Sequence, residues 1–220
     1  MEETNAGKEA LTLPEEGREM INVFCFGDSN TYGYDARSRL GERLPESERW
    51  PELLGENSGW HVINEGLNGR KIPAETWSMN SFDRILSGHP DANMMILMLG
   101  TNDLLGSFRP DACAVGKRME QFILHAQAHP VLHGQGKKIL LIAPPHTDIG
   151  RFGADGDDYD RESRRLGAIY REIASRHGLW FADAGQWEIP LAHDGVHLTP
   201  EGHRIFAEAL WRDYETNQIL

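Results

Sequence analysis

Residues 21–33 have the sequence Ile-Asn-Val-Phe-Cys-Phe-Gly-Asp-Ser-Asn-Thr-Tyr-Gly, an apolar run that leads directly into a serine between two glycines. The apolar part, residues 21–26, is typical of a buried parallel strand. Ser29 is therefore expected at the carboxyl end of a strand, and reacting groups gather at that edge of the sheet in open α/β folds. The alternative is a plain strand-to-helix turn in which Asp28 or Ser29 caps the helix.

Apolar runs and helical patterns alternate along the rest of the chain. Apolar residues three and four apart predict amphipathic helices that include residues 115–126 and 166–174. Gly178 is well placed to end the second of these, and Thr199-Pro200 to begin a last helix. This alternation predicts an α/β domain whose parallel sheet is covered by helices on both faces. The predicted strands are residues 21–26, 60–64, 94–99, 138–143 and 179–182.

The composition is typical of a globular domain. The chain has 220 residues, of which 40% are hydrophobic and 25% charged. The formal net charge of −12 argues against nucleic acid or an anionic membrane as a partner, since both require a basic face. No apolar run approaches the length of a transmembrane helix. We therefore expect a small-molecule partner, with no nucleic acid and no membrane.

The N-terminal segment differs from the rest of the chain. Its first twenty residues hold six glutamates, one lysine and one arginine, without the apolar centre of a signal peptide. We expect residues 1–19 to form a flexible extension and residues 20–220 a single domain, with Met20 as an alternative start. The two cysteines, Cys25 and Cys113, make no disulfide framework. Because Cys25 falls in a predicted core strand, a reduced cytoplasmic compartment is expected.

Two other predicted strands also end in residues suited to chemistry. Gly100-Thr101-Asn102-Asp103 follows the third strand, and the side-chain amide of Asn102 could donate a hydrogen bond to an oxyanion there. Capping of a helix is the alternative role for this asparagine. Gly69 follows the second strand, where its backbone N–H could approach a substrate closely.

Near the C-terminus, Asp194-Gly195-Val196-His197 precedes the last predicted helix. Asp and His at this spacing can fold so that the carboxylate binds one imidazole nitrogen and the other nitrogen faces a serine. The chain has ten histidines, so a loop histidine without a role is the alternative. His193 and His203 have no acid at the spacing of this loop, and His146 lies in a proline turn.

Together these blocks resemble the SGNH (GDSL-type) hydrolase family in order and distance, over roughly residues 20–215. The four blocks are Gly27-Asp28-Ser29, Gly69, Gly100-Thr101-Asn102-Asp103 and Asp194-x-x-His197. Asn30 departs from the pattern, because leucine follows the serine in the family name; we expect this to affect substrate preference. The chain is most similar to the bacterial arylesterase, acyltransferase and carbohydrate-esterase branch, through residues 29–34, 49–51, 64–67, 98–103 and 183–185.

The resemblance implies a flavodoxin-like three-layer α/β/α fold with a five-stranded parallel sheet. It implies Ser29 as the nucleophile, His197 as general base and then acid, and Asp194 as the group that orients His197. The oxyanion hole would combine the N–H groups of Ser29 and Gly69 with the amide of Asn102. Asp28 would fix the turn. Homo-oligomers occur in this branch, so an assembly is compatible with the resemblance, and the sequence sets no subunit number.

The function expected on these grounds is hydrolysis of short-chain, acetyl-like esters of aryl alcohols or carbohydrates through an acyl-enzyme. An acyltransferase or thioesterase with the same triad is an alternative. A more distant alternative is a non-enzymatic anion-binding module of flavodoxin-like fold, although nothing resembles a phosphate loop. Tyr34, Trp50 and Trp77 are candidates to line the substrate pocket, and a core position is open to each.

No cofactor and no metal are expected. A zinc site needs three or four closely spaced ligands, and the isolated pair His125 and His129 is expected to lie solvated on one helix face. Residues 144–160 contain three glycines and an acidic cluster without the spacing of a calcium loop. This segment could form a lid or an intersubunit loop, or simply a solvated surface loop.

Overall fold

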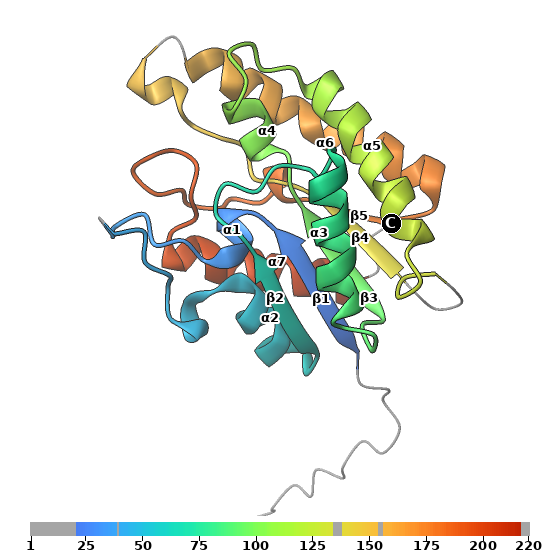
Figure 1. The fold of residues 1–220 in the computed structure, drawn as a ribbon. Helices are drawn as coiled ribbons and strands as arrows, with labels where there is room; N and C mark the ends of the chain where they lie inside the picture. The colour runs from blue at the N-terminus through green and yellow to red at the C-terminus, as the bar shows by residue number, and fades with distance from the viewer. Residues whose placement is uncertain (1–20, 39, 134–137, 154–155, 217–220) are drawn as a thin grey trace, which may run out of the picture.

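A five-stranded parallel sheet forms the centre of the molecule (Figure 1). The computed structural model describes residues 21–38, 40–133, 138–153 and 156–216, so the predicted extension 1–19 and Met20 lie outside the described residues. The strand order is β2-β1-β3-β4-β5, the flavodoxin-like order. The strands are β1 Asn22–Gly27, β2 His61–Gly66, β3 Met94–Met98, β4 Lys138–Ala143 and β5 Trp180–Asp183. The predicted α/β class and all five strands are confirmed.

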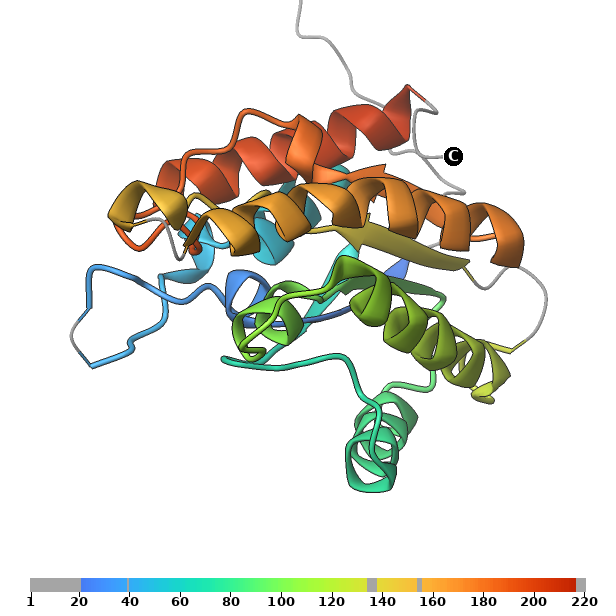
Figure 2. The same cartoon turned by 90° about the horizontal axis from the view of Figure 1, so that it is seen from above.

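Helices cover both faces of this sheet. Alternate residues of β1 are apolar on each face, and each face therefore packs against helices. Phe24 and Phe26 point into one apolar cluster with α3, α5 and α6, whereas Val23 and Cys25 point into a second with α2 and α7. Figure 2 shows α7 on one side of the sheet and α3 and α5 on the other. The long helices are α2 Trp50–Ser58, α3 Thr76–Ser87, α5 Ala112–Ala128, α6 Asp157–His177 and α7 Pro200–Glu215.

Local capping accounts for several element ends. Gly178 ends α6 in the left-handed conformation, with φ of 63°, and Thr199 caps α7 by accepting the N–H of Gly202. Both predicted helix ends are confirmed. The short helices are α1 Ser29–Tyr32 and α4 Thr101–Leu105, and the 3₁₀ turns are η1 Glu46–Glu48, η2 Gly150–Phe152 and η4 Ala184–Gln186.

The acidic segment at 144–160 is partly helical and not only a loop. Asp157, Asp158 and Asp160 lie in the first turn of α6, where carboxylates favour the helix dipole. Asp160 is buried and accepts hydrogen bonds from the Thr147 hydroxyl at 2.6 Å and from the Gly150 N–H at 2.7 Å. This carboxylate therefore ties the segment after β4 to α6. In the described part of the chain, no helix is long and apolar enough to cross a membrane.

Candidate active site

Ser29 is the first residue of α1, in the tight turn that follows β1. Asp28 caps α1 and accepts the N–H of Asn30 at 3.0 Å, and Gly33 closes the turn with φ of 85°. The chain passes so close to itself that a Cβ on Gly27 would lie 2.0 Å from the Thr31 hydroxyl oxygen. Glycine is thus required at the end of β1, and Ser29 is held at the carboxyl edge of the sheet. The expected turn role of Asp28 is confirmed.

Ser29, His197 and Asp194 form an unbroken chain of hydrogen bonds. The Nε2 atom of His197 lies 3.0 Å from the Ser29 Oγ atom, and its Nδ1 atom lies 2.6 Å from Asp194 Oδ2. The other carboxylate oxygen of Asp194 accepts the N–H groups of Val196 and His197, each at 3.0 Å. Burial alone would raise the pKa of Asp194, but these hydrogen bonds to His197 and Val196 lower it below its usual range.

Asn30 links the serine turn to the histidine loop, a contact that sequence reasoning missed. Its side-chain NH₂ donates to the carbonyl of Val196 at 3.1 Å, and its side-chain oxygen accepts the N–H of Leu198 at 2.9 Å. These two bonds flank His197 on both sides and join segments more than 160 residues apart in sequence. Asn30 is 4% exposed. The only signal in the sequence was that asparagine replaces the leucine of the family name.

The predicted oxyanion donors lie on neighbouring segments. The side-chain amide of Asn102 donates to the carbonyl of Arg70 at 3.2 Å, which joins the start of α4 to the turn that contains Gly69. Gly69 has φ of 72°, a conformation that favours glycine. Within the described ranges, the backbone N–H groups of Ser29 and Gly69 have no acceptor. Two unpaired donors are therefore held close to the serine turn.

Buried charges fix the segment around Gly69. The Arg70 guanidinium lies 4.0 Å from the centre of the Phe26 ring and donates to the carbonyls of Gly27, at 2.8 Å, and Glu65. Burial lowers the pKa of Arg70 to about 10. Burial also raises the pKa of Asp28, the residue before Ser29, to about 6.

Asp103, the residue after Asn102, binds the segment that follows Gly69. Its carboxylate accepts the N–H of Ile72 at 3.0 Å and forms an ion pair with Arg118 of α5. The side chain of Asp103 is completely buried, and this burial raises its pKa above the usual range. α4, α5 and the 67–75 segment are thereby held in one arrangement.

Of the three aromatic candidates, Tyr34 and Trp77 line the site region and Trp50 does not. The Tyr34 ring lies 4.5 Å from the His197 ring, centre to centre. Trp77 is 74% exposed and lines the cavity beside Gly69. The prediction for Trp50 is wrong, because it begins α2 in the core, with 0% exposure, and packs on Phe206 of α7.

The competing histidines lie in other environments. His193 is exposed beside Asp194. His203 is completely buried, and its Nδ1 atom accepts the backbone N–H of Trp50 at 3.3 Å. Burial, together with the charges of His197 and Arg49, lowers the pKa of His203 to about 3, so its ring is neutral.

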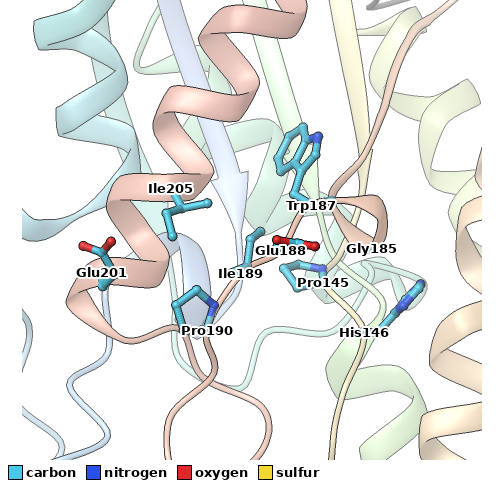
Figure 3. Close-up of a pocket in the computed structure, with 10 residues that line it drawn as sticks. Pro145, His146, Gly185, Trp187, Glu188, Ile189, Pro190, Glu201 and Ile205 are labelled. Carbon is cyan, nitrogen blue, oxygen red and sulfur yellow. The ribbon is translucent and has the colours of Figure 1, made fainter.

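Two cavities of similar volume lie at different positions relative to the candidate catalytic residues. One of about 540 Å³ lies along residues 67–75 and includes Gly69. Another of about 600 Å³ lies between His146, the 184–190 segment and the start of α7 (Figure 3). Neither Ser29 nor His197 is among the residues that line either cavity, but the first is lined by Gly69 and the second is not. The first cavity, which borders the predicted oxyanion donor, is therefore the relevant one.

His125 of α5 and His129, the residue that follows this helix, do not form the predicted solvated pair. His129 caps the end of α5, is buried, and lies 3.3 Å from the Ser87 hydroxyl. His125 pairs with Asp83 at 2.7 Å. Across the described ranges, no three His, Cys, Asp or Glu side chains are grouped so that they could hold a metal ion.

Comparisons with known proteins agree with this constellation. The family model of the GDSL-like lipases and acylhydrolases matches residues 25–205. A carbohydrate acetylesterase family member from Sinorhizobium meliloti has a similar structure, with 29% identity, 90% of this chain and 98% of that chain covered, and a TM-score of 0.76. The carbohydrate acetylesterase Est24 from the same organism is 25% identical over 89% of this chain and 99% of its own, with a TM-score of 0.75.

Two further proteins are similar to this chain at 24% identity. The aryl esterase of M. smegmatis shares the fold, with a TM-score of 0.75 at 24% identity and coverage of 91% of this chain and 100% of that one. The uncharacterized lipoprotein YqeF of Bacillus subtilis is 24% identical over 96% of this chain and 94% of its own length. With its sheet order, its serine turn and the family match over most of its length, this chain belongs to the GDSL-like lipase/acylhydrolase family and is a carboxylic ester hydrolase.

Proposed function

We propose that this protein hydrolyses short-chain esters of aryl alcohols or carbohydrates through an acyl-enzyme on Ser29. The observation that carries the proposal is the continuous hydrogen-bonded chain from Ser29 through His197 to Asp194, beside the unpaired N–H groups of Ser29 and Gly69. A serine hydroxyl is a weak nucleophile until a base takes its proton, and His197 lies within reach to do so.

In the first half of the reaction, the Ser29 Oγ atom attacks the ester carbonyl carbon while His197 Nε2 takes its proton. The carbonyl oxygen becomes an oxyanion, which accepts hydrogen bonds from the N–H groups of Ser29 and Gly69 and from the Asn102 amide. Asp194 holds the imidazole ring in place and stabilises its positive charge. When the tetrahedral intermediate collapses, His197 gives the proton to the departing alcohol, and the acyl group stays on Ser29.

In the second half, water replaces the alcohol. His197 takes a proton from the water molecule as its oxygen attacks the acyl carbon, and the same donors stabilise the second oxyanion. Collapse breaks the bond to Ser29, whose oxygen recovers the proton from His197, and the carboxylic acid leaves. The enzyme then returns to its starting state.

The preference for short acyl groups and for aryl or carbohydrate alcohols rests on similarity. The names of the related solved structures refer to carbohydrate acetylesterases and to an aryl esterase.

A panel of p-nitrophenyl esters from acetate to palmitate, with acetylated sugars alongside, tests this proposal. We expect kcat/KM to be highest among the short acyl groups and to disappear in Ser29→Ala. A maximum at long fatty acyl chains would contradict the substrate preference. Undiminished hydrolysis by Ser29→Ala would contradict the serine mechanism. Product analysis with added alcohol separates hydrolysis from acyl transfer.

A further inference from the structure

The cavity of about 540 Å³ along residues 67–75 has an apolar floor and a basic wall. The floor lies between the sheet and α3, and the exposed Trp77 ring stands at the rim. Such a floor favours methylene or aryl groups, because burying them removes apolar surface from water. The apolar residues of the floor are Phe26, Ile72, Phe82 and Ile85.

The basic wall is unusual in a chain with a net charge of −12. Arg70, Lys71 and Arg118 all line this one cavity, against two carboxylates, those of Glu75 and Asp103. Arg70 is bound by backbone carbonyls, and Arg118 is neutralised by the buried carboxylate of Asp103. Lys71 forms no ion pair or hydrogen bond with any residue that the structure describes.

The Lys71 ammonium group is directed toward α4 and Asp103. A Cβ atom on Gly106, at the end of α4, would lie 2.2 Å from the Lys71 nitrogen. The charge of Lys71 is also close enough to lower the pKa of Asp103, against the dominant effect of burial. The unpaired ammonium group therefore lies near the Asp103 carboxylate, with which the Arg118 guanidinium also pairs.

The position of His197 indicates which part of an ester would enter this cavity. His197 protonates the departing alcohol, so the alcohol leaves on the side of the His197 ring, where Tyr34 also lies. Neither of these residues lines the cavity, which instead borders Gly69 on the oxyanion side. The acyl group is the part of the substrate that points away from His197.

We propose that this cavity is an acyl subsite for groups that end in a negative charge, as in the half-esters of dicarboxylic acids. The methylene groups would lie on the apolar floor, and the terminal carboxylate would bind Lys71 and the outer side of the Arg118 guanidinium. The proposal rests on the proposed function, since it names the acyl class of the same hydrolysis.

The test compares two esters of equal acyl length, mono-p-nitrophenyl glutarate and p-nitrophenyl pentanoate. We expect wild-type protein to favour the glutarate half-ester. In Lys71→Met the ratio of the two kcat/KM values should fall about tenfold, because one charge-assisted hydrogen bond is lost. Lys71→Arg should keep most of the preference. The matched control is Lys117→Met, on the exposed side of α5 and outside the cavity lining, which should leave the ratio unchanged.

Several outcomes would overturn the inference without touching the proposed function. These are equal kcat/KM for both esters in the wild type, or an unchanged ratio in Lys71→Met. A Lys71-dependent preference for m-acetoxybenzoate over phenyl acetate would place the anion on the alcohol side, and so would also overturn it.

If neither ester is hydrolysed but p-nitrophenyl acetate is, the inference is overturned and the proposed function stands. If p-nitrophenyl acetate is not hydrolysed either, the proposed function fails, and the inference is then decided by calorimetric titration with the free acids. Tighter binding of glutarate than of pentanoate, lost in Lys71→Met and kept in Lys117→Met, would support the anionic subsite. Equal binding of the two acids would overturn it.

Discussion

Ser29 and His197 contribute to the same proton transfer, which makes their contributions non-additive. Ser29→Ala and His197→Ala should each lower kcat by a factor of about 10⁴ to 10⁶, and the double variant should lose little more. Hydrolysis of p-nitrophenyl acetate measures this, with circular dichroism to confirm the fold. His193→Ala is the control, since that ring is exposed and forms no hydrogen bond with the triad in the described part of the chain. An inactive His193 variant beside an active His197 variant would show that the base is wrongly assigned.

Asn30 positions His197 through the backbone on either side of it, without touching the reacting atoms. Asn30→Leu keeps the branching and the number of side-chain heavy atoms and removes both hydrogen bonds, to Val196 and from Leu198. We expect kcat to fall up to about a hundredfold, the effect of a misplacement of about 1 Å, while KM stays close to that of the wild type. Steady-state kinetics on p-nitrophenyl acetate separates the two constants.

The matched control for Asn30 is Asn57→Leu, at an exposed position of α2. It should retain wild-type kcat and KM. If Asn30→Leu raised KM and left kcat unchanged, Asn30 would be a substrate-selecting residue, as the sequence alone suggested. A positioning role would then be wrong.

At the scale of elements, His203 makes the packing of α7 against α2 sensitive to acid. Its ring lies buried between the two helices, with a pKa of about 3 in place of the ordinary 6.5. Between these two values the unfolded chain binds a proton that the folded protein does not. The contribution of the neutral His203 ring to the free energy of unfolding is therefore at its full value above about pH 6.5. This contribution is lost as the pH falls toward 3.

We expect His203→Gln to flatten this dependence. Between about pH 7 and about pH 5, the free energy of unfolding of the wild type should fall by roughly 2 kcal/mol more than that of the variant. Urea denaturation at both pH values measures the difference. Asp28, whose raised pKa acts in the opposite sense, is present in both proteins and cancels in the comparison. Parallel pH profiles would contradict the prediction.

The sequence predicted those elements whose determinants are local. All five strands were found, because buried parallel strands are continuous apolar runs, and both helix ends at Gly178 and Thr199 carry their own capping residues. The helices α2 and α3 were not delimited. In α3 only Phe82 and Leu86 are fully buried, but Met79 and Ile85 also pack against the core, so the apolar spacing of this helix was present in the sequence and was not used.

In the candidate site, too, the sequence predicted the residues that local motifs mark and missed the environments that depend on distant contacts. The chain order of the motif blocks was enough to select Ser29, Asp194 and His197, which the structure brings into hydrogen-bonding contact. The environments of Trp50 and His203 depend on contact between α2 and α7, which are about 150 residues apart. No local pattern indicates such packing, and for this reason Trp50 remained a candidate for the pocket and the burial of His203 was not predicted.

At the scale of the whole molecule, the strand order explains why these segments meet. The chain adds β2 on one side of β1 and then returns to add β3 on the other, which opens a crevice at the carboxyl ends of β1 and β3. Ser29 follows β1 and Asn102 follows β3, so both border this crevice. The segment between β5 and α7 brings His197 and Asp194 to the same edge.

This arrangement also predicts how the protein responds to metal removal. Both ring nitrogens of His197 are already within hydrogen-bonding distance of Asp194 and Ser29, and the proposed reaction takes its proton transfers and oxyanion stabilisation from side chains and backbone N–H groups. We therefore expect kcat/KM for p-nitrophenyl acetate to be unchanged after dialysis against EDTA, relative to dialysis against buffer alone. Loss of turnover that zinc or calcium restores would show that a metal site takes part. In that case, circular dichroism of the EDTA-treated protein would tell whether the metal supports the reaction or the fold.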